Sequence, residues 1–101
     1  MAELTVVYWR DIPSQVIAKA GRTSEKRMLS DRFQEAIDMA AMRDGAAGTD
    51  DYLAAWRRAD PETCGADLAA EAERRVAELE AEFDKAALRA LIDNGGRKPN
   101  S

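Results

Sequence analysis

The hydrophobic pattern of the first twenty residues is typical of a β-hairpin. Residues 4–9 are β-branched or aromatic except for one leucine, and an extended backbone turns their side chains alternately to two faces. In residues 15–20 the apolar Val16, Ala18 and Ala20 alternate with Gln15, Ile17 and Lys19. The connection between the runs reads Tyr8-Trp9-Arg10-Asp11-Ile12-Pro13. Because its proline cannot donate to a strand ladder, we predict two antiparallel strands joined by a loop that exposes aromatic and charged groups.

A helical spacing of apolar residues follows Gly21, which ends the second strand. Thr23 or Ser24 is placed to cap this helix, and the sequence DGAAG at residues 44–48 closes it by turn chemistry. The apolar stripe consists of Leu29, Phe33, Ile37 and Ala40 or Ala41. The pattern therefore predicts one amphipathic helix between these two signals.

The segment 52–58, YLAAWRR, suits either a helix or a strand. Thr49 and the two acids that follow it favour a helix start, whereas the aromatic spacing from Tyr52 to Trp56 suits a strand. A two-stranded hairpin is marginal in water and is stabilised by a third strand. We therefore expect residues 52–58 to form that third strand.

A long helix rich in alanine and glutamate is predicted from Asp67 toward Asn94, with a bend near residues 84–85. The glycines at 95 and 96, like those at 45 and 48, match no phosphate-binding spacing and are interpreted as helix ends. The apolar stripe of this helix consists of Leu68, Ala72, Val76, Leu79, Phe83, Ala87, Leu88, Leu91 and Ile92.

These elements predict an α+β domain in the order β-β-α-β-α, with a small antiparallel three-stranded sheet that carries two helices on one face. The alternative is a β-hairpin followed by a helical bundle. We expect residues 1–96 to form a single globular domain and residues 97–101 to form a frayed C-terminal tail. The predicted buried residues are Leu29, Phe33, Ile37, Leu68, Val76, Leu79 and Phe83.

Composition excludes several classes of function. The 101 residues carry a net charge of −4, which argues against nucleic acid and anionic membrane as main partners because both need a clustered positive surface. No apolar run approaches the roughly twenty residues that span a bilayer, and we expect a cytoplasmic protein. The sequence has no histidine, which removes the commonest general base and metal ligand, and its one cysteine cannot form an internal disulfide.

No arrangement of side chains specifies a reaction. Cys64 lies ahead of a helix that could lower the pKa of its thiol, but no imidazole exists to activate it. The paired acids at 50–51 and at 31 and 35 lie in polar stretches that are typical of solvated surface. We therefore predict no catalytic residue, no cofactor and no metal site.

Tryptophan and arginine are the residue types that most often dominate protein interfaces, and they concentrate at two places in this chain. We predict a partner-binding site at Trp9, Arg10, Asp11, Trp56 and Arg57. If the helices cover one face of the sheet, strand alternation leaves Trp9 on the other, open face. The alternative is that a tryptophan belongs to the core and that the arginines extend over it.

Four segments carry a resemblance to a known family. They are residues 8–13 followed by Gln15-Val16-Ile17, the run RFQEAIDMA at 32–40, Asp51-Tyr52-Leu53, and Trp56-Arg57. Together they resemble the conserved virulence factor domain, a small bacterial family, over nearly the whole chain. The family label describes a phenotype of some members and specifies no fold, ligand or catalytic residue. The resemblance suggests that stand-alone relatives are encoded near folate- and corrinoid-dependent one-carbon enzymes.

We therefore expect a non-catalytic accessory or adaptor protein that binds a protein partner through its hairpin and sheet face, and self-association remains open. One alternative, suggested by the resemblance, is an accessory subunit of a folate- or corrinoid-dependent methyl-transfer system. The other alternative is a small enzyme or cofactor carrier, which requires a bound small molecule.

Overall fold

The computed structural model describes residues 2–46, 48 and 50–98. Within these residues the elements follow the order β-β-β-α-α-β-β-α-α. Their bounds are β1 Glu3–Trp9, β2 Ile12–Ala20, β3 Thr23–Met28, α1 Asp31–Arg43, α2 Asp50–Ala54, β4 Trp56–Arg58, β5 Glu62–Thr63, α3 Leu68–Glu82 and α4 Lys85–Asp93. The predicted α+β class is confirmed, whereas the predicted order of five elements is wrong.

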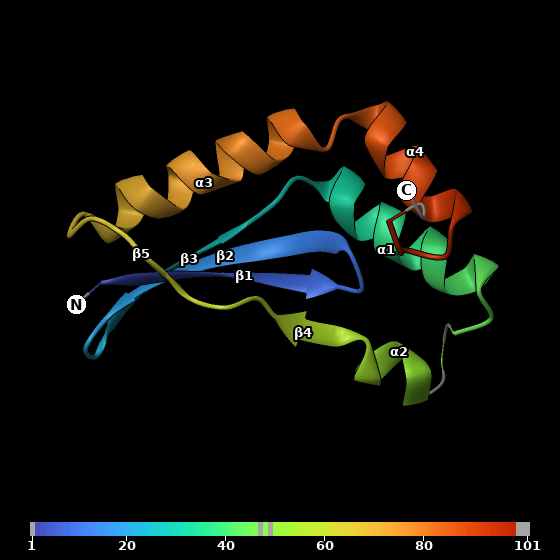
Figure 1. The fold of residues 1–101 in the computed structure, drawn as a ribbon, viewed down its shortest axis with the longest axis horizontal. Coiled ribbons are helices and arrows are strands. Elements are labelled where there is room, and N and C mark those ends of the chain that lie inside the picture. Colours follow the sequence, from blue (N-terminus) through green and yellow to red (C-terminus); the bar gives the residue numbers. More distant parts are fainter. Residues whose placement is uncertain (1, 47, 49, 99–101) are drawn as a thin grey trace.

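The sheet is antiparallel throughout, as predicted, but it has more than three strands. The strands lie in the order β3-β2-β1-β4, and the short β5 also pairs with β1. Helix α3 crosses one face of the sheet (Figure 1). The helices α1, α2 and α4 gather around the end of the sheet where β1 turns into β2 (Figure 1).

Residues 23–28 form the strand β3 and not the start of the first helix, so that prediction is wrong. Gly21 has a φ of +59°, which lets the chain turn back directly onto β2. The segment holds no apolar residue before Met28, so a helix here would have no face to bury. Helix α1 begins instead at Asp31, after Ser30.

Residues 52–58 divide between the two predicted structures. Helix α2 ends at Ala54, and the acids Asp50 and Asp51 stabilise its N-terminal turn. The next residues, Trp56–Arg58, pair with Val7–Trp9 of β1 as the strand β4. The prediction of a strand is therefore right for the second half of the segment and wrong for the first.

The predicted long helix is broken rather than bent. Phe83 leaves the helical conformation with a ψ of +70°, and the side chain of Asp84 caps α4 by accepting a 2.9 Å hydrogen bond from the N–H of Ala87. The break places α4 beside α1 (Figure 1). No helix among the described residues is long and apolar enough to cross a membrane.

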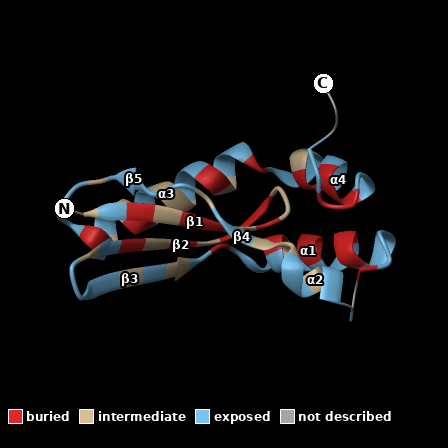
Figure 2. Ribbon diagram, turned by 60° about the horizontal axis from the view of Figure 1, so that its bottom comes forward, coloured by how far each residue is buried: buried red, intermediate tan, exposed pale blue. Residues whose placement is uncertain are grey.

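The core lies between α3 and the sheet and continues into the cluster of helices at the hairpin end (Figure 2). The residues predicted to be buried are buried, except that Val76 is only partly so. Trp9, Phe33 and Ile37 are among the largest fully buried side chains. Burial of Trp9 was the alternative interpretation of this tryptophan, and it decides how the candidate site is built.

Candidate functional site

The turn between β1 and β2 consists of Arg10 and Asp11 and is flanked by the Trp9–Ile12 pair. Arg10 has a φ of +55° and is the one described non-glycine residue in the left-handed region. This conformation costs an L-residue about 1–2 kcal/mol. Such strain persists only where surrounding contacts hold it, and here those contacts converge on the tip of the hairpin.

The Arg10 side chain fastens three segments together. Its Nη1 lies 2.6 Å from Asp44 Oδ2 at the end of α1 and 2.6 Å from the carbonyl oxygen of Gly95. Its Cζ lies 4.6 Å from the centroid of the Trp9 ring. The side chain is only 9% exposed, so most of this guanidinium serves as an internal clamp.

Asp11 binds the C-terminal segment and β4. Its N–H donates to the Gly96 carbonyl at 2.9 Å, and its Oδ2 accepts a 2.7 Å hydrogen bond from the N–H of Lys98. Its Oδ1 accepts a 3.3 Å hydrogen bond from Arg57 Nη2. Residue 98 of the predicted frayed tail is therefore hydrogen-bonded to the domain, whereas residues 99–101 lie outside the described part of the chain.

Arg57 reaches the same turn from β4. Its Nε donates to the Arg10 carbonyl at 2.9 Å, and its Cζ lies 4.7 Å from the centroid of the Tyr8 ring. Burial raises the pKa of the Tyr8 phenol above its ordinary value, although Arg75 and Arg57 oppose the shift. The Arg57 side chain is 49% exposed, so it is available to solvent while its position is fixed.

Trp9 is fully buried, so the expectation that it lies on an open face is wrong. Its indole Nε1 donates to the Tyr52 carbonyl at 2.9 Å, and its ring packs 5.7 Å from the Tyr52 ring. Gly96 lies so close to this ring that a Cβ there would come within 2.7 Å of Cζ3. Trp56 is partly exposed, and its ring packs 6.2 Å from Tyr52. The two tryptophans therefore support the tip rather than form a free aromatic surface.

An open groove of about 690 Å³ lies at the tip and is here called the hairpin-tip groove. It is lined by Arg10, Asp11, Asp44, Asp51, Ala54, Ala55, Arg57 and Arg97. Its three arginines balance its three aspartates. Within the described residues, neither Asp51 nor Arg97 makes a side-chain ion pair or hydrogen bond. The groove thus offers one carboxylate and one guanidinium, beside the half-exposed Arg57, to a molecule that enters it.

Of the six charged residues that line the groove, sequence reasoning named three as site residues and missed three. Arg10, Asp11 and Arg57 of the predicted partner-binding site line the groove. Asp44 was interpreted as a turn residue, Asp51 as a helix-start and surface residue, and Arg97 as a tail residue. Asp44 follows α1, Asp51 lies in the first turn of α2 and Arg97 follows α4, all at a distance in sequence from the hairpin. The order of residue types along the chain does not show that these three positions lie next to the hairpin tip in the folded protein.

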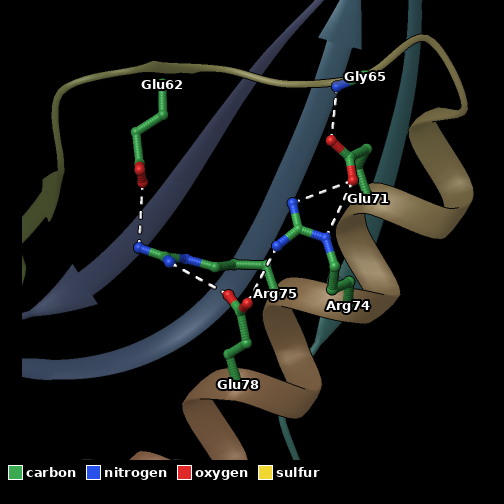
Figure 3. Close-up of polar contacts among 6 residues, drawn as sticks. All are labelled: Glu62, Gly65, Glu71, Arg74, Arg75 and Glu78. Atoms are coloured by element: carbon green, nitrogen blue, oxygen red, sulfur yellow. Dashed lines mark hydrogen bonds and ion pairs between the residues drawn. The ribbon is translucent and has the colours of Figure 1, made fainter.

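A second charged cluster joins β5 to α3 (Figure 3). In this cluster Arg75 bridges Glu62 and Glu78, and Arg74 bridges Glu78 and Glu71. The N–H of Gly65 donates to Glu71 and, with Arg74, lowers the pKa of that carboxyl below its ordinary value. Every carboxylate of the cluster already has a cation or N–H partner, so we interpret the cluster as a structural fastening.

Cys64 lies beside this cluster and lines a small cavity of about 150 Å³. Burial, followed by the negative charge of Glu71, raises the pKa of its thiol above the ordinary value. A raised pKa disfavours the thiolate, which is the reactive form. Within residues 2–46, 48 and 50–98, no three His, Cys, Asp or Glu side chains are grouped so that they could hold a metal ion.

A family model described as "Virulence factor" matches residues 7–92. The chain belongs to this family. The resemblance predicted from four short segments is therefore confirmed. The match to the Virulence factor family includes the hairpin tip, α2 and β4, and it ends before Arg97. No curated protein and no solved structure shows a match to the chain.

Proposed function

We propose that this member of the Virulence factor family is a non-catalytic accessory or adaptor protein that binds a protein partner in the hairpin-tip groove. Arg10, Asp11 and Arg57 shape the binding surface, and Asp51 and Arg97 supply its unpaired charges. Trp9 and Trp56 act by holding the tip in place. The observation that carries the proposal is a groove in which a carboxylate of α2 and a guanidinium of the C-terminal segment, both unpaired among the described residues, lie beside a strained turn that several hydrogen bonds hold in place.

The rigidity of the tip supports this role. Two turn residues are bound to the end of α1, to β4 and to the C-terminal segment by the hydrogen bonds described above. A surface that is already ordered loses less conformational entropy on binding. Arginine is also enriched at interfaces, because its planar guanidinium can pair with carboxylates and stack on aromatic rings.

The proposal is tested by cross-linking and affinity purification from the native cell with the full chain, followed by mass spectrometry. Replacing Arg57 or Asp51 by alanine should reduce recovery of a specific partner at least about tenfold, because each removes a groove charge. Arg22→Ala is the matched control, since Arg22 is exposed in the turn between β2 and β3, at the far end of the sheet (Figure 1). Equal recovery by Arg57→Ala, Asp51→Ala and Arg22→Ala would remove the groove from consideration.

Trp9 requires a separate measurement because its side chain is buried. We expect Trp9→Ala to lower the melting temperature strongly and to leave the partner affinity of the folded fraction close to that of the wild type. Thermal unfolding and partner binding measured on one preparation distinguish these effects. A large loss of affinity without loss of stability would assign Trp9 a direct role in the interface.

The family resemblance suggests a folate- or corrinoid-dependent methyl-transfer enzyme as the partner. Co-expression with such an enzyme should then raise its solubility or activity, and the Arg57→Ala variant should not. If the protein is instead a small enzyme or cofactor carrier, native mass spectrometry of the purified chain will show a small molecule at stoichiometric occupancy.

A further inference from the structure

Strand β3 forms one edge of the sheet, and among the described residues no strand pairs with its outer side (Figure 2). Its six residues, TSEKRM, contain neither proline nor glycine, and their register with β2 is continuous from Thr23 to Met28. The opposite edge is formed by β4 and β5, which have three and two residues. Only β3 therefore offers an edge long enough to accept another strand.

The hydrogen bonds of β3 show which groups point outward. The N–H of Leu29 donates to the Ser14 carbonyl at 3.1 Å, which makes residues 14 and 29 a hydrogen-bonded pair. Such pairs alternate along an antiparallel ladder, so Glu25 and Arg27 also bond to β2. The N–H and C=O groups of Ser24, Lys26 and Met28 then point away from the sheet. The Lys26 carbonyl accordingly accepts a hydrogen bond from the Arg27 side chain and not from β2.

We propose that two copies of the chain associate through antiparallel pairing of their β3 edges, with Lys26 facing Lys26 of the second copy. In an antiparallel pair, outward-pointing residues must face one another, so the two-fold axis can pass at residue 25, 26 or 27. An axis at residue 25 or 27 places two glutamates or two arginines directly opposite each other. An axis at Lys26 instead places Glu25 of either copy opposite Arg27 of the other copy, which gives two pairs of opposite charge.

Charge at the edge permits this contact. Glu25, Lys26 and Arg27 together with Glu73, which lies 3.3 Å from Arg27, sum to zero in a chain whose net charge is −4. The edge is therefore less repulsive toward a second copy than the average surface of the protein. Met28 is 61% exposed and would be partly covered by the second strand. The facing Lys26 pair opposes association, so the dimer is weak and depends on concentration.

Sedimentation equilibrium of the full chain from about 10 µM to about 1 mM should show a reversible monomer–dimer equilibrium. Glu25→Arg and Arg27→Glu, each measured alone, should weaken association at least about tenfold, because two opposite-charge pairs become like-charge pairs. An equimolar mixture of these two variants should form a heterodimer, since each Arg then faces a Glu. Circular dichroism verifies that both variants are folded.

Lys26 provides a second and independent test. Lys26→Pro removes an outward N–H and leaves the β2 ladder intact, so it should abolish association in a folded chain. Lys26→Thr should tighten the dimer about threefold by removing the like-charge pair. The proposal is overturned if the wild type stays monomeric at about 1 mM, if the mixed charge variants fail to associate, or if folded Lys26→Pro still dimerises.

Discussion

Replacing Gly96 by alanine should destabilise the protein more than replacing Gly21, although both glycines have positive φ values, +90° and +59°. A Cβ at residue 96 would lie 2.7 Å from Trp9 Cζ3, whereas nothing lies within 4 Å of a Cβ at residue 21. Trp9 has no exposed surface, so its ring cannot move away without displacing its neighbours. The comparison therefore separates steric overlap from backbone strain.

The expected magnitudes follow from these two contributions. The left-handed backbone alone costs an alanine about 1–2 kcal/mol, which is the loss expected for Gly21→Ala. Gly96→Ala adds overpacking against a rigid ring, which costs about 1–3 kcal/mol in a close-packed core. For a domain of this size, that difference between the variants corresponds to a further fall in melting temperature of roughly 5–20 °C.

Urea unfolding followed by far-ultraviolet circular dichroism measures both free energies, and equal m-values confirm that the denatured states are comparable. A Trp9→Phe background provides the mechanistic control, because a smaller ring leaves room beside residue 96. The extra cost of Gly96→Ala should fall there by about 1 kcal/mol or more. Equal losses for the two glycine variants, or a cost unchanged by Trp9→Phe, would refute the packing argument.

Three further predictions concern the core, the β5 fastening and the clamp. Phe33→Ala should cost about 3–5 kcal/mol in urea unfolding, and a loss below about 1 kcal/mol would contradict its place in the core. The N–H of Gly65 lowers the pKa of Glu71, so this carboxylate contributes stability at neutral pH that is lost as the pH falls through its folded pKa. The difference in melting temperature between wild type and Glu71→Gln should therefore shrink from about pH 7 to about pH 3, and a constant difference would disprove the linkage. Arg10→Ala should destabilise by about 1–3 kcal/mol in urea unfolding, and by more than Asp44→Ala because Asp44 is half-exposed; the reverse order would contradict the clamp.

Patterns within a few neighbouring residues were sufficient to predict the β1–β2 hairpin and helix α1. The alternation of residues 4–9 and 15–20 predicted the β1–β2 hairpin, and the apolar spacing from Leu29 to Ile37 predicted α1. Strand β3 was missed because Thr23 and Ser24 are good helix caps, and an exposed edge strand has no apolar alternation that reveals it. The partner that decides its structure is β2, which the segment meets only after the chain turns.

The candidate site could be predicted only in part because its residues come from segments that are far apart in the sequence. The residue types of the β1–β2 turn and of β4 indicated Arg10 and Arg57, whereas Asp44 and Arg97 reach the groove from distant helix ends. The exposure of Trp9 was predicted wrongly because strand alternation predicts on which face of the sheet a side chain lies. It does not predict which other segments cover that face. Tyr52 and Gly96, which contact the indole, lie far from it in the sequence, Tyr52 at a separation of 43 positions.

The clamp at the hairpin tip also has a consequence for folding kinetics. The hydrogen bond from Arg10 to the Gly95 carbonyl joins residues 85 positions apart. Such a contact cannot form before α1 and α4 have docked, because the entropic cost of closing so long a loop must first be offset by packing. The β1–β2 hairpin, by contrast, can form early from local contacts. Changes in the clamp should therefore accelerate unfolding while leaving the folding rate nearly constant, so that Arg10 and the C-terminal glycines set the lifetime of the native state.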